Sequence, residues 1–421
     1  MNSITAASAI TWVIAALATA GIVIRPWHLP EAIWALAGAV LLVVSGLLSW
    51  RDALAGAAKG IDVYFFLTGM MLLAELARQE GLFDWLAAKA TLLARGSPLR
   101  LFALIFGVGI VVTAFLSNDA TAVVLTPAVA AVAKAAGAAK PLPYLLICAF
   151  VANAASFILP ISNPANLVIY GSHMPRLLQW LPRYLPASVL AIAATYVALR
   201  FSQRKHLRET LATRIAVPAL NGGARLAAAG IAAATIILLT VSALGFQLGL
   251  PTFLAGAVTA LIVFWRPACH PFETLRNIPW GILPLVAGLF VLVAGLENSG
   301  ASIALANALQ QLNQHSASLA AWLSGILIGI GCNLVNNLPA ALLAGSVLGM
   351  AHAPGDVHAA VLIGVDLGPN LSITGSLATI LWLAALRREG LIVDGWTFLK
   401  LGAIVMPPAL VLALAGVSAF S

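Results

Sequence analysis

Two carboxylates stand at breaks in otherwise apolar stretches of this chain, Asp119 and Asp366. A charged group at membrane depth costs about 2.5 kcal/mol or more, so such a residue usually faces a cavity and serves a function. A carboxyl group there can bind and release a proton, which makes both residues candidate proton-coupling groups. The alternative is that each only caps a half-helix, a role in which aspartate is common.

Carboxamides and hydroxyls gather at the same breaks. They can bind a neutral polar solute, or they can satisfy backbone groups that the break leaves free. Six asparagines lie within or beside the four breaks, which is more than four turns require, so the set favours a polar-solute site. They are Asn118, Asn163, Asn166, Asn336, Asn337 and Asn370. The candidate substrate-binding residues are Asn118, Thr121, Ser162, Asn163, Asn336, Asn337, Asn370, Ser372 and Thr374, with Asn166 and Ser117 nearby.

The chemistry of the solute follows from what the breaks lack. No lysine or arginine lies beside them in the sequence, so a di- or tricarboxylate would meet no fixed countercharge. Helix N-termini can bind anions unaided, so an anion stays open, but a small neutral polyhydroxy solute fits best. Cys148, Cys269 and Cys332 are far apart and predict neither a disulfide framework nor a metal site. We expect no cofactor and no enzymatic centre.

The composition requires a membrane around these breaks. Of the 421 residues, 62% are hydrophobic and 9% are charged, whereas soluble domains carry about 25% charged residues. The chain is therefore predicted to be an all-α polytopic protein of the bacterial inner membrane. Its net charge of +8 is spread over short loops, which excludes a nucleic-acid surface. The first apolar run, 9–24, is expected to be a retained span.

Apolar runs near the length that crosses a bilayer, about 20 residues, predict the order of spans. They lie near 8–24, 31–49, 61–78, 142–172, 184–202, 226–245, 251–265, 280–297, 358–386 and 396–419. Two stretches, 100–134 and 317–351, are interrupted at their centres and predict re-entrant hairpins, although two full crossings each remain possible on charge alone. Amphipathic surface helices are expected at 82–95 and 301–314.

The two halves therefore have the same order of elements. We predict a first repeat over 1–202, a basic cytoplasmic linker over 203–225 and a second repeat over 226–421. About five spans per half is an odd number, so the repeats must be inverted relative to each other. With the linker inside, only Arg51, Lys59, Arg176 and Arg183 of the 22 Lys and Arg residues fall outside. The positive-inside rule then predicts both termini to be periplasmic.

At its breaks the sequence resembles the arsenite permease family. The stretches that carry the resemblance are FLSND at 115–119, LTP at 125–127, ISN at 161–163, NNLP at 336–339, VDLGPN at 365–370 and GSLATILWL at 375–383. The resemblance spans essentially the whole chain. The sequence departs from the family pattern at Asn370, where many relatives carry lysine, and at 372–374, where the usual Thr-Pro is absent. These changes leave the coupling ion open.

The resemblance implies export of neutral As(OH)3 and Sb(OH)3, in exchange for protons and in some systems driven by a soluble ATPase. The sequence does not decide whether such an ATPase docks on the cytoplasmic face at 203–225. Arsenous acid is neutral and carries three hydroxyls, which suits a site of Asn, Ser and Thr. The main alternative is a carrier of an anion or dicarboxylate coupled to sodium or protons. A passive channel or an intramembrane enzyme is a further alternative.

Overall fold

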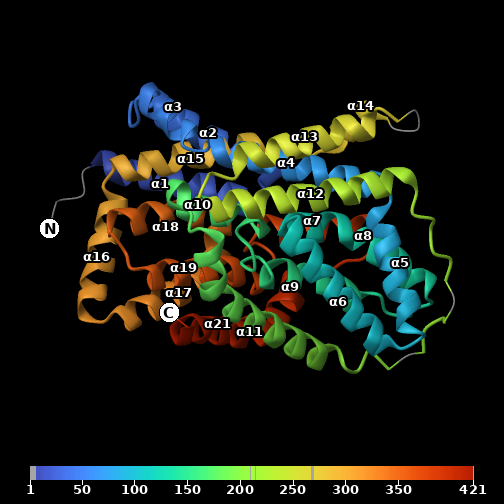
Figure 1. Cartoon of the computed structure of the whole chain (residues 1–421). Helices are drawn as coiled ribbons and strands as arrows, with labels where there is room; N and C mark the ends of the chain where they lie inside the picture. Colours follow the sequence, from blue (N-terminus) through green and yellow to red (C-terminus); the bar gives the residue numbers. More distant parts are fainter. Residues whose placement is uncertain (1–5, 209, 214, 267–269, 421) are drawn as a thin grey trace.

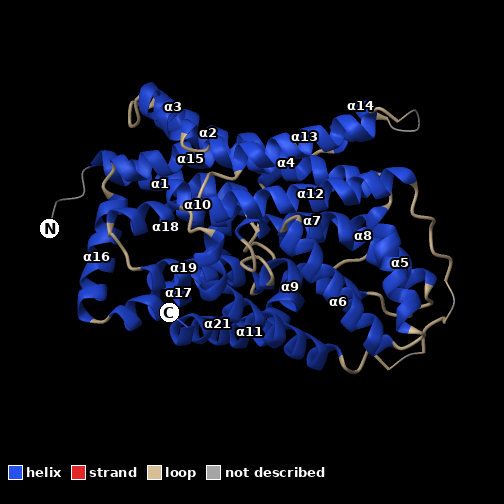
Figure 2. Ribbon diagram, viewed as in Figure 1, coloured by secondary structure: helices blue, strands red, loops and turns tan. Residues whose placement is uncertain are grey.

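The chain folds into a bundle of helices. In the computed structural model, the described residues are 6–208, 210–213, 215–266 and 270–420, and no strand occurs among them (Figures 1 and 2). Seven helices in this described part of the chain are long and apolar enough to cross a membrane. The bent pair α3 and α4, which turns by 47°, adds an eighth.

The first half follows the predicted order of elements. It comprises α1 (Ala6–Ile24), a 3-10 turn (Pro26–His28), α2 (Glu31–Val44), α3 (Trp50–Ala58), α4 (Ile61–Gln79), α5 (Leu82–Ala94), α6 (Pro98–Phe115), α7 (Asn118–Ala120), a π-helical turn (Thr121–Leu125), α8 (Thr126–Ala135), α9 (Leu142–Ala154), a 3-10 turn (Pro160–Ser162), α10 (Pro164–Tyr170), a 3-10 turn (Gly171–His173) and α11 (Leu177–Gln203). The sequence did not predict α3, which begins after the Ser49 cap, whose hydroxyl accepts the Asp52 N–H.

The second half has the same order. It comprises α12 (Gly222–Leu244), α13 (Gly249–Phe264), α14 (Pro271–Asn277), α15 (Ile282–Asn298), α16 (Ala301–His315), α17 (Ala317–Val335), α18 (Asn337–Met350), α19 (Gly355–Leu367), a 3-10 turn (Gly368–Asn370), α20 (Leu377–Arg388) and α21 (Gly395–Phe420). Helix α14 was also not predicted. Helices are confirmed where surface helices were expected at 82–95 and 301–314, as α5 and α16, although α5 is about half buried.

Each interrupted stretch folds as a hairpin whose arms return to one end of the molecule. Helix α5 packs on both α6 and α8 of the first hairpin (98–135), and α16 packs on both α17 and α18 of the second hairpin (317–350). Helices α5 and α16 stand at opposite ends of the bundle, at the right and left of Figure 1. This is the arrangement that two inverted repeats would give.

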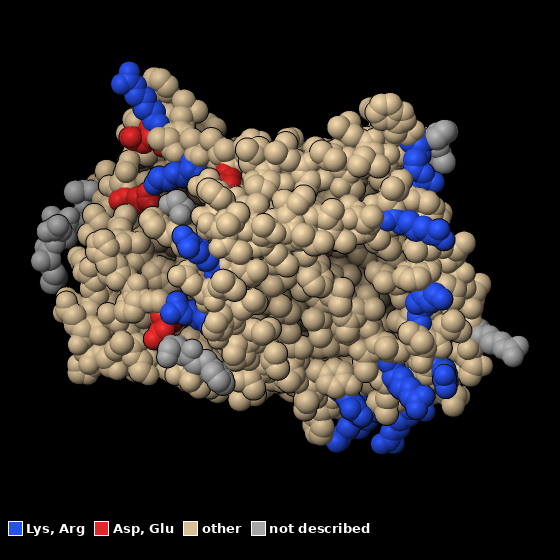
Figure 3. All heavy atoms as spheres, viewed as in Figure 1, with Lys and Arg blue, Asp and Glu red and all other residues tan. Residues whose placement is uncertain are grey.

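The charged residues agree with a membrane that crosses the middle of the bundle. On the face drawn in Figure 3, Lys, Arg, Asp and Glu gather at the two ends, and the broad band between them carries almost none. The longest helices run between these ends (Figure 1). Helix α1 begins at the same end as α16, the end opposite α5.

Proline residues and capping side chains create the breaks. Pro127 lacks an N–H and its ring crowds the preceding turn, so the helix before it widens into the π turn at Thr121–Leu125. Pro164 occupies the first position of α10, where a missing N–H costs nothing. The side chains of Asn163 and Ser376 cap α10 and α20 by accepting backbone N–H groups. The two broken helices are thus α9–α10 (142–170) and α19–α20 (355–388).

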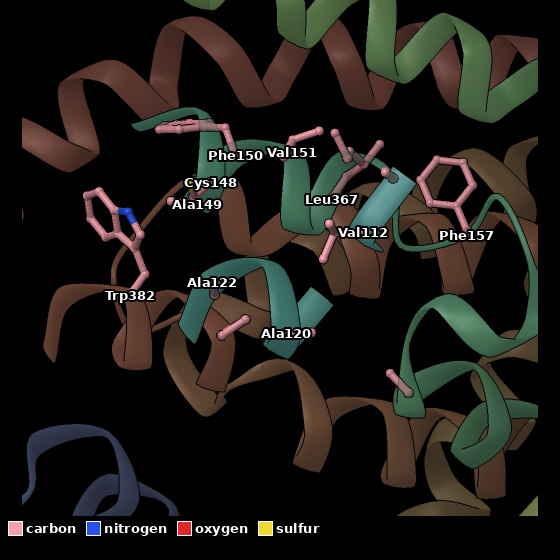
Figure 4. Packing of buried hydrophobic residues seen from close by; sticks show 14 of the residues in the cluster. Val112, Ala120, Ala122, Cys148, Ala149, Phe150, Val151, Phe157, Leu367 and Trp382 are labelled. Carbon is pink, nitrogen blue, oxygen red and sulfur yellow. The ribbon is translucent and has the colours of Figure 1, made fainter. Parts of the chain in front are cut away.

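Glycines allow the second hairpin to pack tightly on the second broken helix. A Cβ added at Gly364 would lie 2.2 Å from the Gly325 carbonyl oxygen, and one at Gly368 would lie 2.2 Å from that of Gly329. Gly364 and Gly368 are four residues apart, as are Gly325 and Gly329. Each of these two pairs therefore forms a strip of small residues along one face of the chain segment that carries it. Figure 4 shows the corresponding apolar packing around α9, where Phe150 lies among hairpin and broken-helix residues.

Candidate functional site

A small polar cavity lies where the hairpins meet the first broken helix. Asn118 and Asp119 reach it from the first hairpin, Asn337 from the second hairpin and Asn163 from the first broken helix. Its volume is about 30 Å3, which is room for about one water molecule. Apolar residues complete the wall, among them Leu67 of α4. Three of the four predicted breaks therefore converge on one point.

Several polar groups at the cavity are not used by the fold. The Asn118 side-chain oxygen accepts the Asp119 N–H at 3.0 Å, which leaves the Asn118 NH2 group free to donate. Among the described residues, the Asp119 carboxylate and the Asn337 amide have no hydrogen-bond partner. Buried polar groups normally find a partner in the protein or in water. These three groups are therefore available to a ligand in the cavity.

Asp366 lies behind this cavity and bonds to one of its lining residues. The Asn163 Nδ2 atom donates to Asp366 Oδ1 at 2.7 Å, and both residues are buried. The Asn163 oxygen accepts the Ala165 N–H at 3.0 Å, so the amide cannot be turned around. Asp366 Oδ1 is therefore an acceptor, and any proton on this carboxyl group must reside on Oδ2. Asp366 Oδ2 is buried without a partner among the described residues.

The remaining predicted site residues do not line the cavity. Thr121 bonds to Thr113 at 2.8 Å, and Ser162 donates to the Ala114 carbonyl at 3.1 Å. Both hydroxyls hold the first hairpin together or attach it to the first broken helix. Asn166 donates to the Ser156 carbonyl at 3.0 Å and stabilises the break itself.

In the second half, the predicted hydroxyls turn toward Asn333. Ser372 donates to Asn333 Oδ1 at 2.7 Å, and Thr374 donates to the Asn333 carbonyl at 2.9 Å. Asn336 donates to the Thr374 carbonyl at 3.2 Å and has a φ of 72°, which is strained for a residue other than glycine. These contacts fasten the second hairpin tip to the second break.

Asn370 belongs to a buried network that the sequence did not reveal. Its NH2 group donates to the Phe150 carbonyl at 3.1 Å, so its oxygen accepts from Asn153 Nδ2 at 3.0 Å. Ser376 and Thr379 extend the network from α20. Asn153 lies ten positions before Asn163 in the same apolar run. A carboxamide inside a span was the signal that could have identified it.

A vestibule of about 540 Å3 leads to Asp119. It shares Leu67, Asp119, Pro164 and Ile282 with the small cavity, so the two spaces adjoin. Its lining also includes three arginines, Arg78, Arg276 and Arg388, which the sequence predicts to be cytoplasmic. No arginine lies beside the breaks in the sequence, but in the folded structure three arginines line the space next to the first break. Arg78 is paired with the buried Glu75 on its own helix.

A second vestibule of about 450 Å3 lies on the other side of α10. Its lining includes Tyr170 at the end of α10 and His173 in the turn that follows. The charged residues Lys59, Asp62 and Glu297 line it as well. Lys59 and Glu297 form an ion pair at 2.9 Å. Residues 167–170 of α10 line this space, and Pro164 at the start of the same helix lines the small cavity.

Neither of the two cysteines in the described part of the chain joins a group of metal ligands. Cys148 and Cys332 are buried and free, and Cys269 lies outside the described residues. Within the described part of the chain, no group of three His, Cys, Asp or Glu side chains is close enough to hold a metal ion.

A cavity with four polar side chains that adjoins a vestibule, held in a helical membrane bundle, is the site of a membrane transporter. The family model described as "Citrate transporter" matches residues 6–365 of this chain. The chain therefore belongs to this transporter family, and its relatives confirm the resemblance to the arsenite permeases.

These relatives match over most of their length. The chain is 28% identical to an arsenical pump membrane protein of Escherichia coli over 399 residues, which is 90% of this chain and 91% of that protein. It is 27% identical to a putative arsenical pump membrane protein of Bacillus subtilis over 415 residues, 91% and 93% of the two chains. Among solved structures, the Alcanivorax borkumensis YdaH transporter has a similar fold, with a TM-score of 0.59, 17% identity and coverage of 99% and 97%.

Proposed function

We propose that this protein is a secondary transporter that exports arsenite and antimonite as neutral trihydroxy species in exchange for protons. Similarity to the arsenical pump membrane proteins supports the substrate class. The observation that carries the proposal is the convergence of Asn118, Asp119, Asn163 and Asn337 on one cavity that adjoins a vestibule. No ATP-binding loop occurs in the sequence, so the driving force must come from an ion gradient or a partner protein.

The cavity lining suits As(OH)3. Arsenous acid offers hydroxyl donors and oxygen acceptors but no charge, and the free groups of Asn118 and Asn337 can donate while Asp119 accepts. None of the cavity-lining residues is lysine or arginine. A volume of about 30 Å3 is too small for the solute. The hairpin tips must therefore separate before it binds, as expected of an alternating-access carrier.

Asp119 and Asp366 are the proposed proton-coupling groups. Asp119 faces the vestibule on the predicted cytoplasmic side, and Asp366 is buried behind Asn163. Protonation of either group removes a charge from a site with little water, so it changes the relative stability of the outward-facing and inward-facing states. We place the protein in the bacterial inner membrane with both termini periplasmic.

The anion carrier is the second candidate function, and the vestibule arginines favour it. Arg276 and Arg388 make no ion pair among the described residues, so they could attract an anion toward Asp119. An anion that moved on into the small cavity would then meet a carboxylate and no cation. The geometry therefore favours a neutral solute at the innermost position.

Transport in everted membrane vesicles tests the proposal. An imposed proton gradient should drive uptake of labelled arsenite, and Asp119→Asn and Asp366→Asn should each lower that uptake by roughly 100-fold or more while expression persists. Glu389→Gln, at an exposed position, is the matched control and should behave as wild type. Sodium-driven carboxylate uptake that arsenite does not inhibit would establish the second candidate instead.

A further inference from the structure

The short helix α10 links the surroundings of Asp366 to the second vestibule. Helix α10 begins beside Asn163 at the cavity and ends at Tyr170 in the vestibule wall. Its seven residues at about 1.5 Å per residue span only about 10 Å. A polar route along this helix would therefore join Asp366 to the vestibule on the predicted periplasmic side.

Two tyrosine hydroxyls lie on that route. Tyr170 and Tyr184 bond to each other at 2.6 Å, and Tyr184 is fully buried. Trp180 packs on Tyr184 with ring centroids 4.1 Å apart, which holds the ring in place. Tyr184 also interacts electrostatically with Asp366. The hydrogen-bonded pair thus begins at the vestibule with Tyr170 and leads inward to the buried Tyr184, and Asp366 Oδ2 is a buried carboxyl oxygen without a partner among the described residues.

We propose that Tyr170 and Tyr184 conduct protons between the second vestibule and Asp366, with a water molecule completing the path at Asp366 Oδ2. This rests on the proposed proton exchange. A hydroxyl can accept one proton while it donates its own. A hydronium ion in the vestibule gives a proton to Tyr170 and becomes water, Tyr170 passes its own proton to Tyr184, and Tyr184 passes its proton through the bridging water to Asp366. Each tyrosine ends unchanged, and the carboxylate becomes a carboxylic acid.

Asn163 blocks proton transfer from Asp366 toward the small cavity. Its Nδ2 atom donates to Asp366 Oδ1 and carries no lone pair that could accept a proton, so protons cannot hop from Asp366 into the small cavity. Asp366 then exchanges protons with one side of the membrane while Asp119 faces the other. This separation prevents a proton leak while the cavity is open to the first vestibule.

Charged and titratable groups near Tyr170 set the electrostatic field at the entrance. His358 stacks on the Tyr170 ring at 5.7 Å, and Arg183, which forms an ion pair with Asp356 at 3.8 Å, interacts with the Tyr170 hydroxyl. The vestibule also contains Lys59, Asp62, His173 and Glu297. A pH profile of transport will include these groups, so a single curve does not isolate the tyrosines.

Phenylalanine variants therefore provide the test. In proteoliposomes, Tyr170→Phe and Tyr184→Phe should lower arsenite transport driven by a proton gradient by roughly 100-fold, the usual weight of a positioned proton-transfer group. Exchange of labelled for unlabelled arsenite at equal pH needs no net proton transfer and should keep the wild-type rate. Tyr196→Phe, on the same helix α11 but packed against Phe102 and Phe106, is the control.

The outcomes separate the two proposals. Gradient-driven transport at the wild-type rate in both variants would overturn the tyrosine path while leaving proton exchange intact. Equal loss of driven transport and of exchange would assign the tyrosines a structural role and also overturn it. If collapsing the proton gradient has no effect on the wild-type protein, proton exchange itself fails and the path fails with it.

Discussion

Asn163 donates to Asp366 at 2.7 Å, and this bond joins the first break to the second across 203 residues of chain. The same amide caps α10 through its oxygen. The cap that starts one half-helix is therefore also the partner of a buried carboxyl group in the other half of the chain. A change in the charge of Asp366 will act directly on the start of α10, which lines the cavity at Pro164.

Asn163→Ala should weaken both the fold and the coupling. It removes a helix cap worth about 0.5–2 kcal/mol and leaves the buried Asp366 carboxyl group without its donor, which costs about 1–3 kcal/mol more. We expect a melting temperature several degrees lower in detergent and loss of proton-driven uptake.

Asn163→Ser is the matched variant for this prediction. Serine caps helices about as well as asparagine, but its side chain is too short to reach both Ala165 and Asp366. The variant should recover much of the thermal stability without recovering proton-driven transport. If it transports as wild type, the bond to Asp366 has no part in coupling.

Asp366→Asn should separate proton use from substrate exchange. An asparagine oxygen can still accept from Asn163, so the fold should persist, but the side chain no longer titrates. Proton-driven arsenite uptake should fall by roughly 100-fold while arsenite exchange at equal pH continues. A variant that still responds to the proton gradient would assign coupling elsewhere.

The order of elements could be predicted because each one depends on its own sequence. The lengths of the apolar runs predicted the spans, and the polar stretches with Pro164, Pro339 and Pro369 marked three of the four breaks. The sequence missed the short helices α3 and α14. The span expected at 31–49 ends at Val44, because the chain turns at Gly46 with φ 73° and restarts behind the Ser49 cap.

The site was harder to predict because its contacts join distant segments. The tips marked by Asn118 and Asn337 do meet, as their positions beside breaks suggested. Nothing in the sequence could indicate that Ser372 would bond to Asn333 rather than face the cavity, because both choices satisfy a hydroxyl. The arginines of the first vestibule likewise come from three separate helices.

The glycine strip between α17 and α19 should be sensitive to a single methyl group. Gly364→Ala would bring its Cβ within 2.2 Å of a backbone oxygen, and overpacking of this kind costs about 1–3 kcal/mol. Gly331→Ala on α17 is the control, because no atom lies within 4 Å of its added Cβ. Thermal unfolding in detergent should show a loss of stability for the first variant, and a neutral or slightly positive effect for the second.

The vestibule arginines distinguish a neutral solute from an anion. Arg276→Gln and Arg388→Gln remove positive charge from the route to Asp119 but not from the cavity wall. If the transported species is As(OH)3, the half-saturating arsenite concentration should stay within about twofold of wild type, and added salt should have little effect, because a neutral solute gains nothing from electrostatic steering.

For an anionic substrate, the double variant should instead raise the half-saturating concentration roughly tenfold or more at low ionic strength, and salt should remove the difference. Lys205→Gln, at an exposed position in the basic linker, removes a charge of the same sign away from the vestibule and controls for changes in net charge. A salt-sensitive loss of arsenite transport in the arginine variants alone would contradict the neutral species.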